Sequence, residues 1–165
     1  MNMFDVILHP TDFSTDSDQA FLLACSIARD QFAELVVVHV LAPSNFSGGE
    51  SDEDLLSENL PAVRECREHF QRMRSIAGDI PLSFRISVGY AVGTILNVAR
   101  EEKADLILIA SHQHSPFQLQ LHGSVAEGVL RQAHCQVLCL RQPTLHSAAS
   151  SSPASNRAPG TGCAW

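Results

Sequence analysis

The sequence predicts an α/β fold, a single doubly wound, five-stranded parallel sheet with helices on both faces. Short runs rich in apolar and β-branched residues, such as Leu35–Leu41 and Asp105–Ile109, are typical of parallel strands covered on both sides. Between such runs lie segments with apolar residues every three or four positions, as amphipathic helices require. Five strands alternating with four helices favour a doubly wound sheet, which binds ligands where loops leave the carboxyl ends of its strands.

Each element is predicted from its own local pattern. The first strand is expected at Phe4–Leu8, and the segment Ser14–Asp18 then supplies an N-cap with a Thr15 to Asp18 variant of the capping box. A polar, acidic stretch at 43–54 is expected to be a surface loop. The remaining elements are a helix through Ala20–Ala28, the strand Leu35–Leu41, a helix at Leu60–Ala77 stopped by Gly78, a strand at Leu82–Val88 with one polar face, a helix through Val92–Ala99, the strand Asp105–Ile109, a helix at Ser124–Ala133 and a strand at Val137–Leu140.

Length and composition indicate one compact domain over residues 1–141 and a tail over 142–165. The tail is rich in Ser, Ala and Pro and cannot bury enough apolar area to offset the entropy of ordering, so disorder is expected. No apolar run approaches the roughly 20 residues of a membrane span. The start of the chain lacks a basic segment and a small-residue cleavage site, so we expect no secretory signal and a cytoplasmic location.

The charge balance argues against nucleic acid as a partner. Eleven Lys and Arg face eighteen Asp and Glu, for a formal charge of −7. The one basic cluster, within the helix at 60–77, is interleaved with glutamates and is expected to be a solvated face. Five cysteines without CxxC spacing do not form a disulfide framework, and most are expected to be small buried apolar side chains.

The segment from Ala110 to Val125 joins the end of a predicted strand to the start of a helix. Gly123 and Ser124 at that helix start have two interpretations. They offer bare backbone N–H groups, a hydroxyl and the positive end of the helix dipole to an anion, or Ser124 is an ordinary N-cap. Taken alone, the residues favour the ordinary cap.

The wider chain resembles the universal stress protein family over about residues 3–141. The resemblance rests on the order of the elements and on four phrases: Val6–Ser14, Val38-His39-Val40, Gly123–Ala126 and Val137–Arg141. It implies a nucleotide-binding fold and a homodimer joined along the last strand, Val137–Leu140, an apolar edge strand that invites pairing with its copy.

The ATP-binding branch of that family reads Gly, two residues, Gly, nine residues, Gly, then Ser or Thr. Here Ala110, Gln113, Gly123 and Ser124 occupy those positions. Glycine is used where a Cβ would block the approach to phosphate or forbid a left-handed turn, so the Gln is a costly replacement. We therefore expect weakened or lost ATP binding.

The resemblance also assigns the expected contacts of an adenine nucleotide such as ATP or AMP. Pro10, Thr11 and Asp12 match the turn on the adenine side, and Val40 matches the strand end whose backbone faces the base. Gly123, Ser124 and Val125 match the phosphate side, next to Ala110 and Gln113. If no nucleotide binds, Asp12 is a capping carboxylate and Val40 is plain core, while His39 is expected to be structural in either case.

No residues for catalysis are identified, so the expected function is that of a non-catalytic stress-response protein acting by binding and dimerisation. The alternative is slow ATP hydrolysis or phosphotransfer, with Asp12 and Ser124 around a magnesium ion. A minor alternative is metal binding by the histidines near the key loop, since imidazole is a common ligand, although no Cys or carboxylate lies at ligand spacing beside His9, His112, His114 and His122.

Overall fold

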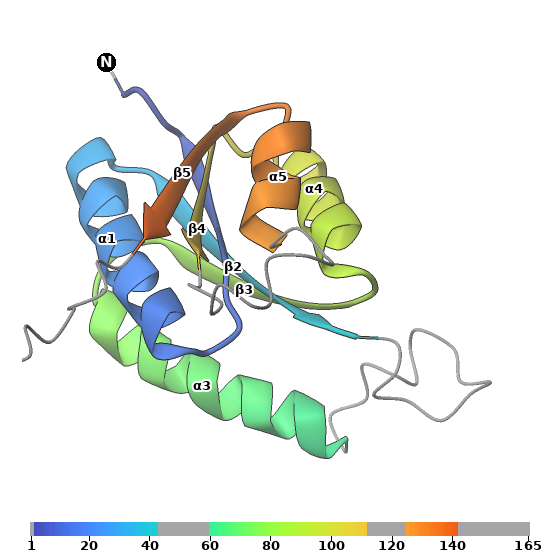
Figure 1. The fold of residues 1–165 in the computed structure, drawn as a ribbon. Helices are drawn as coiled ribbons and strands as arrows, with labels where there is room; N and C mark the ends of the chain where they lie inside the picture. Colours follow the sequence, from blue (N-terminus) through green and yellow to red (C-terminus); the bar gives the residue numbers. More distant parts are fainter. Residues whose placement is uncertain (1, 43–59, 112–124, 142–165) are drawn as a thin grey trace, which may run out of the picture.

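A computed structural model describes residues 2–42, 60–111 and 125–141. The predicted loop at 43–54, the central part of the Ala110–Val125 segment and the tail at 142–165 lie outside the described residues. Strands and helices alternate along the chain (Figure 1). Their bounds are β1 Val6–Pro10, α1 Thr15–Gln31, β2 Glu34–Leu41, α3 Pro61–Ala77, β3 Leu82–Val88, α4 Ala91–Glu101, β4 Leu106–Ser111, α5 Val125–Gln132 and β5 Gln136–Arg141.

The strands form one parallel sheet in the order β3-β2-β1-β4-β5. This order confirms the predicted fold class. The chain builds outward from β1 through β2 to β3, then crosses back to β4 on the other side of β1. The order therefore reverses between β1 and β4, and this reversal is where a doubly wound sheet opens a crevice at the carboxyl ends of its strands.

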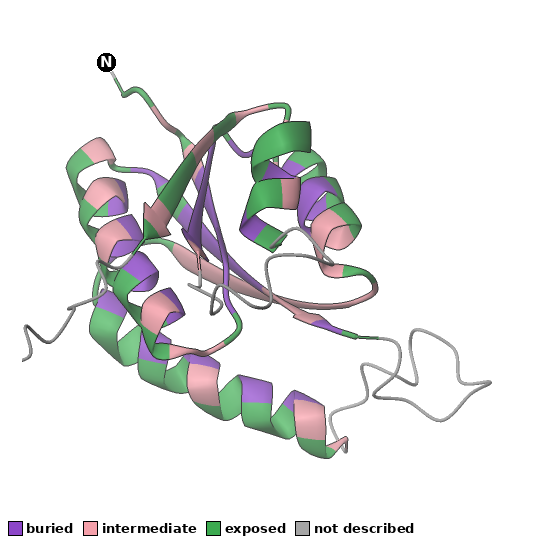
Figure 2. Ribbon diagram, viewed as in Figure 1, coloured by how far each residue is buried: buried purple, intermediate pink, exposed green. Residues whose placement is uncertain are grey.

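Helices cover both faces of the sheet, and the core has two layers. Ile7, Leu35, Val37 and Leu108 belong to the layer under α1 and α3. Successive strand residues point to opposite faces, so their neighbours belong to the layer under α4 and α5. The central strands are accordingly buried along most of their length (Figure 2), which explains their continuous apolar sequences. The second layer includes Leu8, Val36, Val38, Ile107 and Ile109.

The first strand begins later than its apolar pattern predicts. It runs from Val6 to Pro10 instead of Phe4–Leu8. The N–H groups of Asp5 and Val6 donate to the Asp105 carboxylate, at 2.8 and 3.0 Å, so a side chain about 100 residues away holds the chain where the strand ladder starts. Phe4 packs on the core from outside the ladder.

The cap of α1 is also displaced from its predicted place. Ser14 is the N-cap, with extended backbone, and its Oγ accepts from the N–H of Ser17 at 3.2 Å. Thr15 is therefore the first helical residue and not the cap that the predicted Thr15 to Asp18 box requires. The ends of α3 agree with prediction, since Gly78 stops the helix at a φ of +67°.

The four cysteines of the described residues differ in burial, and Cys135 is half-buried. Cys25 on α1 and Cys66 on α3 are buried, as predicted, and burial raises the pKa of each thiol to about 11. Cys139 is exposed, contrary to the expectation for most cysteines, because it lies on the edge strand β5. The four arginines of α3 are exposed, as predicted for a solvated face: Arg64, Arg67, Arg72 and Arg74.

None of the helices in the described part of the chain is long and apolar enough to cross a bilayer.

Candidate functional site

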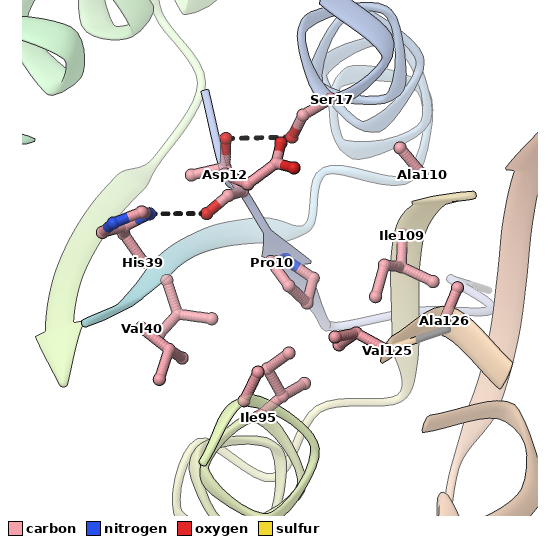
Figure 3. A pocket seen from close by; sticks show the side chains of 13 residues that line it. Pro10, Asp12, Ser17, His39, Val40, Ile95, Ile109, Ala110, Val125 and Ala126 are labelled. Atoms are coloured by element: carbon pink, nitrogen blue, oxygen red, sulfur yellow. Dashed lines mark hydrogen bonds between the residues drawn. The ribbon is translucent and has the colours of Figure 1, made fainter. Parts of the chain in front are cut away.

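A cavity of about 170 Å³ lies at the carboxyl end of the sheet, where the strand order reverses (Figure 3). Its walls come from the ends of β1, β2 and β4 and from the first turns of α1, α4 and α5. Its lining residues are Pro10, Thr11, Asp12, Ser17, Val38, His39, Val40, Ala91, Ile95, Ile109, Ala110, Val125 and Ala126.

Most of the candidate site residues meet in this cavity, although they are far apart in sequence. Pro10, Thr11 and Asp12 come from the end of β1, and Val40 comes from β2. Two further candidates line the opposite side, Ala110 from β4 and Val125 from α5. The remaining three candidates, Gln113, Gly123 and Ser124, lie outside the described residues.

The sequence did not identify the residues that α4 contributes to the cavity wall. Ala91 and Ile95 face the cavity from α4, a helix that the family phrases did not include. No local signal marks them, because only the folded arrangement places α4 across from β2. Ser17, Val38, Ile109 and Ala126 were also missed, yet each lies close in sequence to a candidate, and the strand ends could have pointed to two of them.

The turn between β1 and α1 is held by hydrogen bonds to every polar group of Thr11. Its N–H donates to the carbonyl of Val38 at 2.9 Å. Its Oγ1 accepts from the Phe13 N–H at 3.1 Å and from the Ser17 hydroxyl at 2.9 Å. Its carbonyl oxygen lies 2.7 Å from His39 Nδ1. A carbonyl only accepts, so Nδ1 carries the proton and donates.

This bond network fixes an uncommon backbone conformation. Phe13 has a φ of +61°, in the left-handed region, which costs a residue with a Cβ roughly 1 kcal/mol. The next N–H, that of Ser14, donates to Asp12 Oδ1 at 3.0 Å. The turn is thus preorganised, and it holds the Thr11 and Asp12 side chains at the cavity edge.

His39 takes part in the cavity wall, although the sequence suggested a purely structural role. Burial lowers the pKa of its imidazole below the usual 6.5, an effect only partly opposed by the bond to Thr11 and by the charge of Asp12. At pH 7 the ring is therefore neutral, with its single proton on Nδ1.

Most of the side chains that line the cavity are apolar. Val38, Val40, Ile95 and Ile109 supply branched aliphatic walls, and Asp12 is the only formally charged residue in the described lining. The N-termini of α4 and α5 face the same end of the sheet, and the first turn of α4 carries no acidic residue to offset its dipole. The described lining thus combines apolar walls with a few polar groups, as small-molecule sites commonly do.

Of the four histidines considered as a possible metal site, only His9 lies within the described residues. This residue lies inside β1, fully buried, with Nδ1 at 2.9 Å from the Leu108 carbonyl and its ring 5.9 Å from that of Phe21. Burial lowers the pKa of His9 to about 4. The described residues contain no group of three or more His, Cys, Asp or Glu arranged to hold a metal, and His112, His114 and His122 lie outside them.

The strand order and the position of the cavity define a Rossmann-like α/β protein with a cavity at its switch point.

Comparison with known proteins gives the family. The sequence model of the universal stress protein family matches residues 3–141. A universal stress protein of Methanocaldococcus jannaschii is 32% identical over 146 residues, which cover 86% of this chain and 85% of the relative. The chain therefore belongs to the universal stress protein family.

Solved structures agree with this assignment. UspA from Lactobacillus plantarum is 27% identical, with a TM-score of 0.67 over 82% of this chain and 97% of its own. A universal stress protein solved in complex with cAMP is also 27% identical, with a TM-score of 0.67 over 84% of this chain and 98% of its own.

Proposed function

We propose that this protein is a non-catalytic regulator of universal stress type that binds the adenosine part of a nucleotide, with weak affinity for ATP. The observation that carries this proposal is the apolar cavity at the switch point, which brings together Pro10, Thr11, Asp12 and Val40. These are the residues that the family resemblance assigns to the adenine side. The structural relative in complex with cAMP supports an adenine nucleotide as the ligand class.

The walls of the cavity support recognition of a base. Val38 and Val40 on β2 and Ile95 on α4 offer aliphatic surface to the faces of a planar ring. Asp12 at the rim is a strong acceptor for hydroxyl or amino groups, such as those of a ribose or an adenine. The described lining contains no Lys or Arg, so it offers no side-chain cation to a triphosphate.

The proposed weakness toward ATP rests on two side chains at positions that are glycine in the ATP-binding branch. Ala110 is buried in the cavity wall, where its methyl group occupies space that a glycine leaves open. Gln113 is the larger change. Strain of about 1 kcal/mol at such a position corresponds to about a fivefold loss of affinity.

Calorimetric titration with ATP, AMP and cAMP, each with and without magnesium, tests this proposal. We expect measurable binding of AMP or cAMP and weaker binding of ATP. The double variant Ala110→Gly, Gln113→Gly is expected to raise ATP affinity about fivefold or more with little change for cAMP. No heat with any of the three nucleotides at millimolar concentration would refute the proposed function, and ATP affinity unaltered in the double variant would refute the role given to the two side chains.

The same samples test the competing enzymatic function. Slow ATP hydrolysis or phosphotransfer requires tight phosphate binding and a carboxylate near the reacting phosphate, for which Asp12 is the candidate. We expect no phosphate release above background from ATP and magnesium. Turnover that is lost in Asp12→Asn would replace the non-catalytic function with the enzymatic one.

We further propose that the protein acts as a homodimer through β5. This strand is an edge of the sheet and pairs only with β4 among the described strands, while Leu138 and Cys139 on it are exposed. An exposed apolar edge strand is a site for pairing with a second copy. Light scattering coupled to gel filtration is expected to give a dimer mass for the natural protein and a monomer mass for Leu138→Asp, and a natural monomer at high concentration would refute the proposal.

We also propose a cytoplasmic location, because buried thiols such as Cys25 and Cys66 suit a reducing compartment.

A further inference from the structure

Three aromatic rings stack beside the cavity, and one of them, that of His39, belongs to its wall. The ring of Phe13 lies between two imidazoles, that of His39 at 4.5 Å between centroids and that of His69 at 4.2 Å. The interplanar angles are 24° and 13°, so both contacts are face to face. The edge of Phe70 closes the group at 5.6 Å from Phe13. The stack thus joins the turn after β1 to two other elements, β2 and α3.

Of the two imidazoles in this stack, only His39 also hydrogen-bonds the turn within the described residues. It donates from Nδ1 to the Thr11 carbonyl at 2.7 Å and covers one face of Phe13. Figure 3 shows the imidazole directed at the turn, with this bond drawn between them. Thr11 and Asp12 border the cavity, whereas Phe13 does not. His39 therefore contacts the segment that carries two of the candidate ligand contacts.

We propose that His39 is a positioning residue for the ligand site: it holds the turn from Thr11 to Phe13 in the conformation that presents Thr11 and Asp12 to the ligand. This inference rests on the proposed function and adds to it. The left-handed conformation of Phe13 needs support from outside the turn, and His39 supplies that support on one face of the ring.

His69 supports the other face of Phe13 from α3. Within the described residues it makes no hydrogen bond to the turn, and its Nδ1 accepts from an Arg72 guanidinium nitrogen at 2.9 Å. Loss of His69 therefore removes ring stacking on Phe13 and an exposed bond from Arg72 but no hydrogen bond to the turn, whereas loss of His39 removes stacking and a half-buried hydrogen bond to the turn together. The two histidines thus provide a matched pair for separating these contributions.

The experiment compares His39→Ala, His39→Asn and His69→Ala with the natural protein. Asn places an amide N–H group the same number of bonds from the backbone as Nδ1 of His, so it restores the donor without the ring. Affinity for AMP and cAMP is measured by calorimetry at pH 7. We expect about a tenfold loss in His39→Ala, recovery to within about threefold in His39→Asn and a loss below about threefold in His69→Ala.

Amide hydrogen exchange of the ligand-free proteins gives a second readout that does not depend on binding. The N–H groups of Phe13 and Ser14 bond to side chains inside the turn, so they report its conformation directly. We expect faster exchange at both in His39→Ala, natural rates in His39→Asn and unchanged rates at Ile107 and Leu108 in the core.

Two results would overturn the inference, and each is distinct from a failure of the proposed function. Exchange at Phe13 and Ser14 that is unchanged in His39→Ala removes the positioning role, whether or not nucleotide binds. A natural protein that binds nucleotide, with equal affinities in His39→Ala and His39→Asn, also removes it. If the natural protein binds neither AMP nor cAMP, the proposed function fails, and the exchange data alone then decide whether His39 orders the turn.

Discussion

The buried imidazole of His9 makes the stability of this protein depend on pH. Its Nδ1 donates to the Leu108 carbonyl, and its Nε2 has no hydrogen-bond partner among the described residues. Protonation would place a charge and an unsatisfied N–H group in the core, so burial lowers the pKa of His9 from 6.5 to about 4.

The sign and size of the effect follow from proton linkage. The unfolded chain binds a proton at His9 below pH 6.5, whereas the folded protein binds it only near pH 4. The contribution of neutral His9 to the free energy of unfolding is therefore fully present above pH 6.5. It falls as the pH drops from 6.5 to about 4, and it does not change further below that pH. At about 1.4 kcal/mol for each pH unit, the loss amounts to about 3 kcal/mol of unfolding free energy.

Urea unfolding of the natural protein and of His9→Leu at pH 7, 6, 5 and 4 measures this loss. Carboxylates and His39 titrate in both proteins, so the difference between the two curves isolates His9. We expect that difference to shift by about 3 kcal/mol in favour of the leucine variant between pH 7 and pH 4. Two curves that run parallel over this interval would show that His9 is hydrated or paired, and the argument from burial would fail.

Three further changes test the packing around the site, each through the free energy of unfolding. Ser14→Ala removes the cap of α1 and should cost about 1 kcal/mol, whereas the exposed Ser75→Ala in α3 should cost less than about 0.5 kcal/mol; equal losses would contradict the role of the cap. Gly128→Ala puts a Cβ at 2.7 Å from Val92 Cγ2, where α5 meets α4, and should cost about 1 to 2 kcal/mol. Adding Val92→Ala should remove the clash, whereas a double variant whose loss equals the sum of the two single losses would argue against it. Phe70→Ala deletes a ring stacked on Phe84 and should cost about 3 kcal/mol, with a loss below 1 kcal/mol counting against this packing.

The fold could be predicted because the sequence pattern of each element reflects how that element is buried. Leu35–Leu41 is apolar on both sides of the chain because α1 and α3 cover one face of the sheet and α4 covers the other. The strand Leu82–Val88 alternates because it is an edge strand, half-buried along its whole length. The spacing of apolar residues along a strand follows which of its faces are buried, and burial in this fold depends on the position of the strand in the sheet.

The boundaries that were wrong depend on partners far away in sequence. The start of β1 is set by the Asp105 carboxylate, which takes the N–H groups of Asp5 and Val6. The surroundings of His9 also depend on residues far away in sequence. The sequence grouped it with loop histidines, but alternation along β1 turns its side chain toward Phe21 on α1 and away from the cavity.

Part of the cavity lining could be predicted from the sequence, through residues that lie in or beside a family phrase. Thr11, Asp12 and Val40 do meet at one cavity. Ala91 and Ile95 do not carry such a signal, because their role comes from the packing of α4 across the sheet. The support that His39 gives to Phe13 is also invisible in sequence, since these residues are 26 positions apart and meet only through the parallel pairing of β1 with β2.

The sequence by itself determined the type and order of the strands and helices, the strand ends that carry Thr11 and Val40, and the cap-forming polar turn before α1. These features are local, because propensity and periodicity act over a few residues. Only the tertiary structure decided that the strand order reverses beside β1, that α4 completes the cavity wall, and that His39 donates to Thr11. Those outcomes depend on which surfaces pack together, and free energy of packing is a property of pairs of distant segments and not of either segment alone.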